Sequence, residues 1–251
     1  LSNQICTVGI GIPGFSSNET GLVTNANSIW LNDKPFKKDL EIALNRKVKL
    51  MNDANCFTLS EAVDGAGKDY QSIFGIIVGT GFGGALSYKK EIIEGANQIA
   101  GDWGHQPLPY PTKEEIETKI NCPSMNCGRP LCSEQFMSGI GFKDVFNQKH
   151  KTNFTSEEIA KLDLDGDPRA NSELSLYEDR MARLMAVMIG IFDPDAVILG
   201  GGMSNIDRLY KNIPILIPKY TFSNKVITKV LKNFHGDSSG VRGAAWLWNN
   251  V

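Results

Sequence analysis

Short apolar segments that end in glycines, in Pro-Gly or in Asn-Asp alternate along this chain with segments of helical composition. The segments with strand character are Ile5–Ile12, Val48–Met51, Ile73–Val78 and Ala196–Leu199. Strands that alternate with helices are typical of α/β folds, in which ligands bind at the carboxyl ends of the strands. The sequence therefore predicts an α/β protein whose functional groups follow its strands.

The strongest helix signal is Ser172–Ile191, where apolar side chains recur at helical spacing. A hairpin is expected through Lys89-Lys90, and residues 106–132, rich in proline and cysteine, are expected to form a loop. The other expected helices are Lys37–Arg46, Asn55–Val63, Glu134–Lys149, Ser156–Leu162 and Gly240–Trp248.

Composition excludes some classes of function. The net charge of −2 over 251 residues gives no reason to expect a nucleic-acid partner or an anionic membrane surface. No apolar run approaches the roughly 18 residues needed to span a bilayer. Cys6 and Cys56 lie in apolar runs and are expected to be buried. Because the cysteine count of five is odd, we expect a reducing, cytoplasmic compartment.

Four side chains of the kinds that bind structural zinc occur within one segment: His105, Cys122, Cys127 and Cys132. One His and three Cys make a full tetrahedral ligand set. Asp102 and Glu134 lie next to these ligands, so a metal here would position acidic groups in a substrate pocket. If residues 102–105 are helical, Asp102 shares a face with the histidine. The alternative is a set of free thiols in a loop.

Asn52-Asp53 follows a strand and precedes a helix. Asp53 in this position could accept a proton from a sugar hydroxyl, while Asn52 holds the substrate. Both residue types are also favoured as helix N-caps, so that interpretation stays open. Upstream, the amides around Asn27 and the indole of Trp30 are typical of sugar binding. The alternative there is a turn followed by a buried tryptophan.

Two glycine-rich segments follow strands, Gly79–Gly84 and Gly200–Gly202. Backbone N–H groups of the first could cradle a phosphate, and the second could let a flat ligand approach the backbone closely. Neither is a P-loop, because no Gly-Lys-Ser/Thr follows. Ordinary tight turns are the alternative for both segments.

Taken together, these segments resemble the ROK family of bacterial sugar kinases and regulators, and its fructokinase branch in particular. The resemblance is carried by Gly11–Gly14, Asn25–Asn32, Asn52–Asn55, Gly79–Gly81, Gly101–His105, Cys127-Gly128, Cys132–Glu134, Gly200–Asn205 and His235–Ala245. It implies an actin-like (ribonuclease H-like) fold with two α/β domains and a central cleft. It also implies that residues 1–64 with 240–251 form the small domain, and residues 65–239 the large domain with the zinc loop.

The resemblance assigns roles to individual residues. Asp53 matches the general base, and His105, Cys122, Cys127 and Cys132 match the ligands of a structural Zn²⁺. The sugar-binding positions are Gly14, Asn27, Asn52, Asp102, His105 and Glu134. The ATP-binding positions are Gly79, Thr80, Gly81, Gly200, Gly201 and Gly202. Mg²⁺ would accompany ATP, and the chemistry would be phosphoryl transfer by positioning and electrostatics.

This chain departs from the family pattern at several points. The family's N-terminal hairpin, which carries Asp-x-Gly-Gly-Thr and contacts the ATP phosphates, is missing before Leu1. In the zinc loop, Met125 stands where the family has its first cysteine, and Cys122 lies three residues earlier. Leu131 replaces a glycine, and Asp102 stands where glutamate is commoner.

The expected function is that of an ATP-dependent hexose kinase that phosphorylates the 6-hydroxyl of fructose. Glucose, mannose and N-acetylhexosamines are alternatives, because all offer a ring of hydroxyls to Asn27, Asn52 and Glu134. A sugar-sensing regulator and a non-catalytic sugar-binding fragment are alternatives of another class. The presence of Asp53, and the lack of a basic stretch or helix-turn-helix, favour a kinase. The expected partners are a sugar, ATP and a second copy of the chain.

Overall fold

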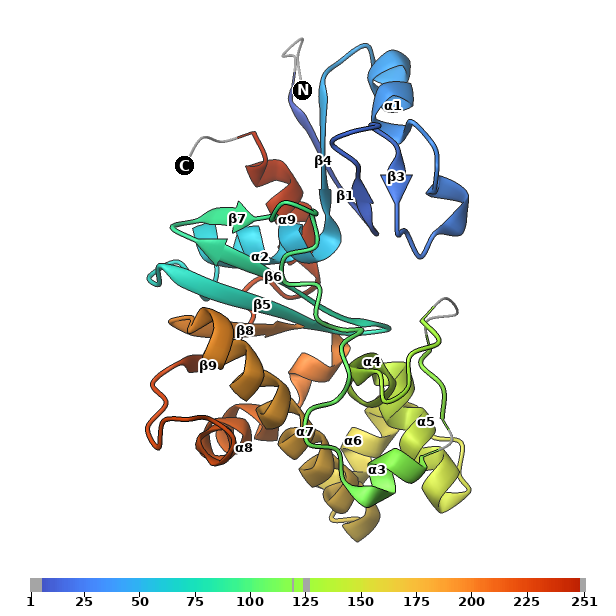
Figure 1. Ribbon diagram of the computed structural model, residues 1–251, viewed down its shortest axis with the longest axis vertical. Helices are drawn as coiled ribbons and strands as arrows, with labels where there is room; N and C mark the ends of the chain where they lie inside the picture. Colours follow the sequence, from blue (N-terminus) through green and yellow to red (C-terminus); the bar gives the residue numbers. More distant parts are fainter. Residues whose placement is uncertain (1–5, 119, 124–126, 249–251) are drawn as a thin grey trace. The chain divides into compact units, whose positions relative to one another are not determined.

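The computed structural model describes residues 6–118, 120–123 and 127–248, drawn in Figure 1. The residues fall into two compact units, each with most of its contacts inside the unit. Unit 1 comprises Leu1–Gly75, Ala85–Gly101 and Asn233–Val251, and unit 2 comprises Ile76–Gly84 and Asp102–Lys232. Ile5 of the first expected strand, Met125 of the expected zinc loop and residues 249–251 lie outside the described residues.

Five strands form one sheet in the order β7-β6-β5-β8-β9. They are β5 (Ser72–Val78), β6 (Phe82–Tyr88), β7 (Glu91–Ile93), β8 (Ala196–Gly200) and β9 (Lys229–Lys232). The hairpin predicted through Lys89-Lys90 is confirmed, since Tyr88 pairs with Glu91. Both lysines have left-handed backbones, with φ of 52° and 66°, as a two-residue hairpin of this type requires.

In unit 1, β1 (Val8–Ile12) pairs in parallel with β4 (Val48–Asn52), and Ile12 lies opposite Asn52. Helix α2 (Asp53–Val63) begins at the residue after β4, so Asn52 and Asp53 lie where a strand passes into a helix, as predicted. The short strands β2 (Phe15–Ser16) and β3 (Val23–Thr24) pair antiparallel. The turn η1 (Ile29–Leu31) and helix α1 (Phe36–Leu44) follow them.

Helix α9 (Ser239–Trp246) packs against α2 and β1 in unit 1, and Figure 1 shows it beside α2. Glycines make this approach possible. A Cβ at Gly243 would lie 1.7 Å from the carbonyl oxygen of Cys56, and one at Gly9 would lie 1.9 Å from that of Ala244. The helix expected over Gly240–Trp248 is present and runs over Ser239–Trp246. The division into residues 1–64 with 240–251 and residues 65–239 stays a prediction.

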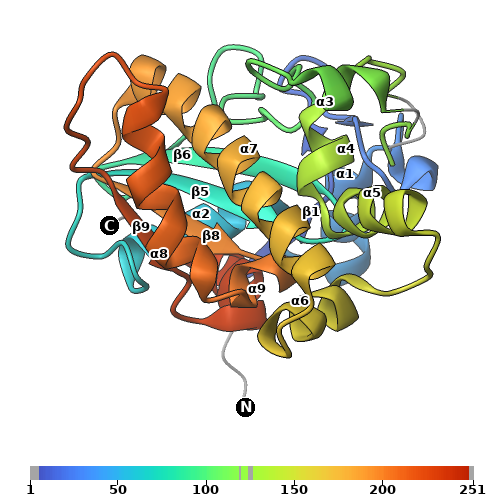
Figure 2. The same cartoon turned by 90° about the horizontal axis from the view of Figure 1, so that it is seen from below.

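Unit 2 is built around α7 (Pro168–Phe192), which packs against α4, α5, α6 and α8. Figure 2 shows α8 alongside α7. Asp167 caps α7 by accepting hydrogen bonds from the N–H groups of Arg169 and Ala170, and Pro168 is its first residue. These start signals place the helix four residues earlier than its apolar spacing alone predicts. The other helices of this unit are α3 (Lys113–Glu117), α4 (Ser133–Met137), α5 (Gly139–His150), α6 (Ser156–Leu164) and α8 (Arg208–Leu216), with the turns η2 (Gly202–Asn205) and η3 (Ile217–Lys219).

Several sequence-based expectations are wrong in detail. The expected helix Glu134–Lys149 is split at Ser138, whose backbone is extended and whose hydroxyl accepts a hydrogen bond from the N–H of Gly141. Ser138 therefore starts a new helix as its N-cap. The expected loop at residues 106–132 contains α3, which begins with a capping box of Thr112 and Glu115.

Three further expectations differ from the structure. Residues 102–105 form a turn and not a helix, so Asp102 and His105 do not share a helical face. Cys6 is exposed, because it precedes the first residue of β1. Trp30 is 73% exposed, so the alternative of a buried tryptophan after Asn27 is wrong. In the described part of the chain, no helix has the length and apolar character needed to cross a bilayer.

Candidate functional site

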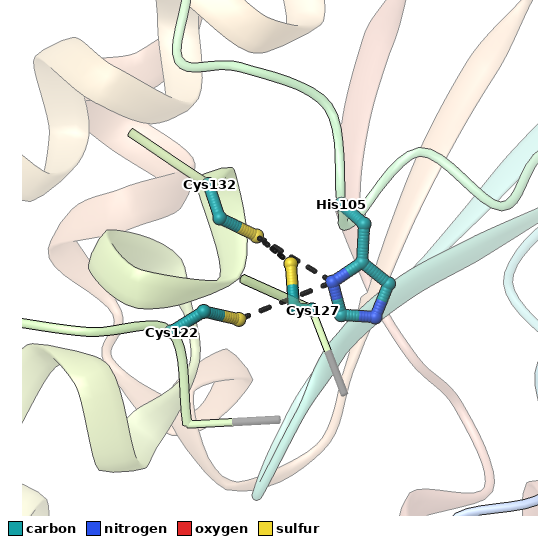
Figure 3. Close-up of side chains that lie close together, drawn as sticks. All are labelled: His105, Cys122, Cys127 and Cys132. Carbon is teal, nitrogen blue, oxygen red and sulfur yellow. Dashed lines mark hydrogen bonds between the residues drawn. The ribbon is translucent and has the colours of Figure 1, made fainter. Parts of the chain in front are cut away.

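The histidine and the three cysteines of the expected metal site come together in unit 2 (Figure 3). His105 lies in the turn that follows Gly104, where the backbone passes close to β6: a Cβ at position 104 would meet the carbonyl oxygen of Phe82 at 1.7 Å. Cys132 is the N-cap residue of α4, and Cys122 and Cys127 lie in the loop that precedes it. Figure 3 shows the three sulfur atoms gathered on the Nδ1 side of the imidazole ring.

The ligand atoms lie at or slightly beyond the separations of a tetrahedral metal site. Nδ1 of His105 lies 3.4 Å from Sγ of Cys132 and 4.0 Å from Sγ of Cys122. Sγ of Cys127 lies 3.5 Å from Sγ of Cys132, and all four ligand atoms lie within 4.8 Å of one another. Zinc bonds of about 2.0–2.3 Å place tetrahedral ligand atoms roughly 3.4–3.8 Å apart. Cys122 therefore belongs to the cluster despite its departure from the family spacing.

The thiols of the cluster differ in their environment. Burial raises the pKa of the Cys132 thiol. Burial acts in the same direction on Cys127, but the hydrogen bond from the backbone N–H of Arg129 and the neighbouring thiols outweigh it and lower the pKa of that thiol. A cysteine binds a metal as its thiolate. The lowered pKa favours the thiolate of Cys127, whereas the raised pKa of Cys132 means that its thiolate would be stabilised only by a cation beside it.

Glu134 connects the thiol loop to the glycine turn within unit 2. Its Oε1 accepts a hydrogen bond from the thiol of Cys122 at 3.6 Å, and its Oε2 accepts one from the N–H of Phe82 at 3.2 Å. The carboxylate is 92% buried and lies close to Gly81, where a Cβ would meet Oε2 at 3.2 Å. A larger residue at position 81 would push against this carboxylate. Asp102, the other acidic residue beside the ligands, is exposed.

A cavity of about 700 Å³ opens in unit 2 next to the first glycine segment. Gly79-Thr80-Gly81 forms the turn between β5 and β6, and Phe82–Gly84 already belong to β6. Gly79 and Thr80 line the cavity, together with the first residues of α5 and α6. Helix N-termini present N–H groups that favour phosphate oxygens, but the N–H of Gly139 is bonded to Gly79 and Glu157 adds a negative charge to this wall.

Of the second glycine segment, Gly200–Gly202, only Gly202 lines the cavity. Gly202 lines it, and a Cβ at this position would meet no atom within 4 Å. Gly201 has a φ of 82°, and a Cβ there would lie 2.7 Å from the carbonyl oxygen of Val78, so it serves the close approach of the backbone to β5. Gly200 ends β8. Lys143 and Lys161, which the sequence did not single out, also line the cavity.

In unit 1, the helix cap and the candidate base are separate residues. Asn52 caps α2: its Oδ1 accepts hydrogen bonds from the N–H groups of Ala54 at 2.9 Å and Asn55 at 3.3 Å. Asp53 is the first helical residue, and it is exposed. The Oδ1 of Asp53 also accepts a hydrogen bond from the N–H of Ala54, at 2.8 Å, whereas the bond to Asn55 is made by Asn52, the N-cap residue. Behind it, burial and the nearby charge of Asp53 raise the pKa of the Cys56 thiol to about 12.

Asn52 also connects the helix start to the glycine-rich turn after β1. Its side-chain N–H donates to the carbonyl oxygen of Gly14 at 3.1 Å. Gly14 has a φ of 77°, and a Cβ there would lie 2.3 Å from the carbonyl oxygen of Thr24, so only glycine fits. Asn27 lies exposed three residues beyond Thr24. Gly14 and Asn52 are thus in direct contact, and Asn27 lies in the next turn of the same unit.

Comparison with known proteins identifies the family. The sequence profile of the ROK family matches residues 1–251. The chain belongs to the ROK family. It is 38% identical over 241 residues to the N-acetyl-D-glucosamine kinase of Vibrio cholerae, a match that covers 96% of this chain and 80% of that protein. The N-acetyl-D-glucosamine kinase of Vibrio atlanticus is 37% identical over 240 residues, with the same coverage of both chains.

Solved structures of the family share the fold. The ROK family glucokinase from Streptomyces griseus, solved with glucose and AMPPNP, superposes with a TM-score of 0.82 and 23% identity, and the match covers 98% of this chain and 82% of that one. The ROK hexokinase from Thermus thermophilus gives a TM-score of 0.80 at 24% identity, covering 95% and 77%. The expected actin-like α/β fold is therefore confirmed.

Proposed function

We propose that this protein transfers the γ-phosphoryl group of ATP to the 6-hydroxyl of N-acetyl-D-glucosamine, with Asp53 as the general base. As a ROK family member with kinases among its similar relatives, the chain is an ATP-dependent sugar kinase. The choice of sugar rests on the N-acetyl-D-glucosamine kinases at 37–38% identity. They favour the N-acetylhexosamine alternative over fructose, which the motifs alone suggested.

The observation that carries the catalytic role is the position of Asp53. The exposed carboxylate lies at the first residue of α2, directly after β4, while Asn52 caps the helix and holds the Gly14 turn. A carboxylate so placed can accept the proton of a sugar hydroxyl as that oxygen attacks the γ-phosphorus. The remaining barrier is lowered by positioning and by charge stabilisation, as in phosphoryl transfer generally.

ATP would bind in the unit 2 cavity, with its phosphates at Gly79, Thr80 and Gly81 and its adenosine at Gly200, Gly201 and Gly202. Mg²⁺, held mainly by the ATP phosphates, would neutralise charge on the transferred group. The hydroxyls of the sugar would be bound by Gly14, Asn27, Asn52, Asp102, His105 and Glu134. Structural Zn²⁺ on His105, Cys122, Cys127 and Cys132 would hold the imidazole through Nδ1 and leave Nε2 available for a sugar hydroxyl.

Substituting the base tests the mechanism. Asp53→Asn keeps the shape of the side chain but removes the proton acceptor, so kcat should fall by roughly 10²–10⁴-fold while sugar binding is largely retained. Asp39→Asn, an exposed acidic residue in the first turn of α1, is the matched control and should keep wild-type turnover. An Asp53→Asn enzyme with more than about a third of wild-type kcat would refute the role.

A substrate panel tests the choice of sugar. Wild-type kcat/KM would be measured for N-acetylglucosamine, N-acetylmannosamine, glucose, mannose and fructose under the same conditions. The proposal requires N-acetylglucosamine to lead. A lead for fructose would restore the substrate expected from the motifs. We also propose that the protein acts as a homodimer in the cytoplasm, as the family resemblance suggests, and light scattering of the purified protein checks the dimer.

A further inference from the structure

A second cavity, of about 340 Å³, lies wholly within unit 1 beside the start of α2. Its volume is at the lower end of the range for small-ligand pockets, about 300–1,000 Å³. It is lined by Asn52 at the end of β4, Asn55 of α2, and Gln98 in the loop after β7. Ser16 at the end of β2, and Ser17 and Asn18 after it, complete this polar part of the lining. None of the positions expected to bind sugar or ATP lines this pocket except Asn52.

Asn55 indicates that this pocket is built for a polar ligand. The residue is 93% buried, and its side chain makes no hydrogen bond within the described part of the chain. The amide atoms of Asn55 are not sealed from solvent, so in a residue this deeply buried they open to the pocket, where water or a ligand can bond to them. The residue lines the pocket, so a ligand there can supply the missing partner.

Gln98 lines the same pocket, and its amide is already oriented by a hydrogen bond within the protein. Its Oε1 accepts a hydrogen bond from the N–H of Asn18 at 3.1 Å, which orients the amide and leaves its NH₂ group as a donor. Its backbone is left-handed, with a φ of 57°, a conformation that is costly for a residue other than glycine, asparagine or aspartate. Such strain is commonly found where a side chain has to be held in a particular place.

The remaining lining residues narrow the chemistry of the ligand. Lys37 and Glu94 contribute opposite charges, so the pocket suits a neutral group better than a carboxylate or a phosphate. Phe15, Leu50 and Met51 add apolar surface against which a methyl group can pack. An acetamido group combines these properties: it is neutral, carries one donor and one acceptor, and ends in a methyl group.

We propose that this pocket receives the 2-acetamido group of the sugar substrate, and that Asn55 and Gln98 distinguish that group from the 2-hydroxyl of glucose. The inference rests on the proposed function. Asn52 lines the pocket and is the neighbour of Asp53 in the sequence, so a sugar ring across the first turn of α2 can reach both. C2 and C6 lie on opposite sides of a pyranose ring, which allows one substituent to enter the pocket while the other meets the base.

The test compares N-acetylglucosamine with glucose, because the two sugars differ only at C2. Gln98→Ala and Asn55→Ala should each lower kcat/KM for N-acetylglucosamine about tenfold, mainly through KM, and change kcat/KM for glucose less than about threefold. Asn97→Ala is the matched control: it is exposed, adjoins Gln98 and does not line the pocket, so it should keep both values.

Calorimetric binding without ATP gives a second readout that does not depend on turnover. Wild-type protein and the Gln98→Ala variant would be titrated with N-acetylglucosamine and with glucose, and only the affinity for the former should fall. Gln98 lies in a surface loop and its variant is expected to fold, so the test stands even if Asn55→Ala is unstable.

The outcomes separate this inference from the proposed function. A wild-type protein that prefers glucose or fructose overturns both proposals. A wild-type protein that prefers N-acetylglucosamine, with variants that lose activity equally on both sugars, leaves the function standing. That result assigns the pocket a structural role and overturns the inference.

Discussion

Two clusters of polar side chains, one in each unit, hold parts of the chain together by different means. In unit 1 the carboxylate cluster comprises Glu61 and Asp64 near the end of α2, with His235, Ser239 and Arg242 from the C-terminal segment. In unit 2 the thiol cluster comprises His105, Cys122, Cys127 and Cys132. The carboxylate cluster joins residues more than 170 positions apart, whereas the thiol cluster lies within one segment. They differ in whether the protein alone can complete them.

The carboxylate cluster is complete as it stands. Glu61 is fully buried, and its two oxygens accept hydrogen bonds from the N–H groups of Ala66, Phe234 and His235 and from the hydroxyl of Ser239. A buried charge is tolerated when hydrogen-bond donors surround it in this way. The cluster thereby holds the segment before α9, and the start of α9, against α2.

The side chains of the thiol cluster are weak hydrogen-bond partners for one another. Its closest contacts join one sulfur to another and sulfur to an imidazole nitrogen, at 3.4–4.0 Å. Thiols are weak hydrogen-bond donors, so these contacts contribute little to stability by themselves. The first cluster is completed by the chain alone, whereas we expect the second to be completed by a cation. Stability should therefore respond to a chelator in one case only.

Removal of the metal is the largest expected effect. Protein purified without chelator should contain about one zinc per chain by elemental analysis. Cys132→Ala, or treatment with a strong chelator, should remove it and lower the free energy of unfolding by several kcal/mol; structural zinc contributes about 10–16 kcal/mol in small zinc-finger peptides. Hydrogen exchange should rise first around His105 and at the start of α4.

Cys6→Ser is the control for that experiment, because Cys6 is exposed and lies outside the cluster. This variant should keep its zinc and its stability. Purified wild-type protein that contains no metal, and whose three loop thiols are all alkylated in the native state, would contradict the site.

The thiol cluster could be predicted from the sequence, whereas the carboxylate cluster could not, and the difference has a physical reason. Cysteines and a histidine in one segment are rare, and their ligand chemistry makes them recognisable from the sequence alone. Glu61 and Asp64 are acidic residues on a helix, which most often face water. Apart from Ala66, their partners lie more than 170 residues downstream, and no local pattern connects the two. The C-terminal segment was predicted as a helix over Gly240–Trp248, without any partner for its polar side chains.

The same distinction applies to the fold and to the candidate site. Strands and helices followed from apolar periodicity, and Asn52 and Asp53 from their place between a strand and a helix. The composition of residues 134–149 favours one continuous helix. The helix is interrupted at Ser138 because the side chain of this residue caps α5. Which residues line a pocket depends on segments that meet only in the folded chain, as Asn55 and Gln98 do. The spacing of apolar residues does not predict which segments come into contact in the folded protein.

Substitution at the centre of the carboxylate cluster should have the next largest effect. Glu61→Leu leaves four donors in and around a buried site without their acceptor, which should cost about 3–5 kcal/mol of unfolding free energy in urea titrations. Glu61→Gln keeps one acceptor oxygen and should cost clearly less. The loss should be the same with and without chelator, and the zinc content should not change. A chelator-dependent loss would show that the two clusters do not act independently.

The smallest expected effect concerns Asp64, and it depends on pH. Partial burial raises the pKa of this carboxyl, but hydrogen bonds from Arg242 and His235 outweigh it and lower the pKa below its ordinary value. A group whose folded pKa is lowered stabilises the fold above its unfolded pKa, near 3.9, and loses that contribution as the pH falls through the folded pKa. Asp64→Asn should therefore lower stability at pH 7, by less than about 1 kcal/mol because the pair with Arg242 is partly exposed.

The pH dependence distinguishes this effect from a simple loss of packing. The difference between wild-type protein and the Asp64→Asn variant should shrink toward zero in urea titrations as the pH is lowered from 5 to 3. Acid also protonates the ligands of the thiol cluster, but it does so in both proteins, so that contribution cancels in the difference. Asp165→Asn, at the exposed end of α6, should show no difference from wild type at either pH. A difference for Asp64→Asn that stays constant across this range would mean that the charge of Asp64 does not stabilise the attachment of α9.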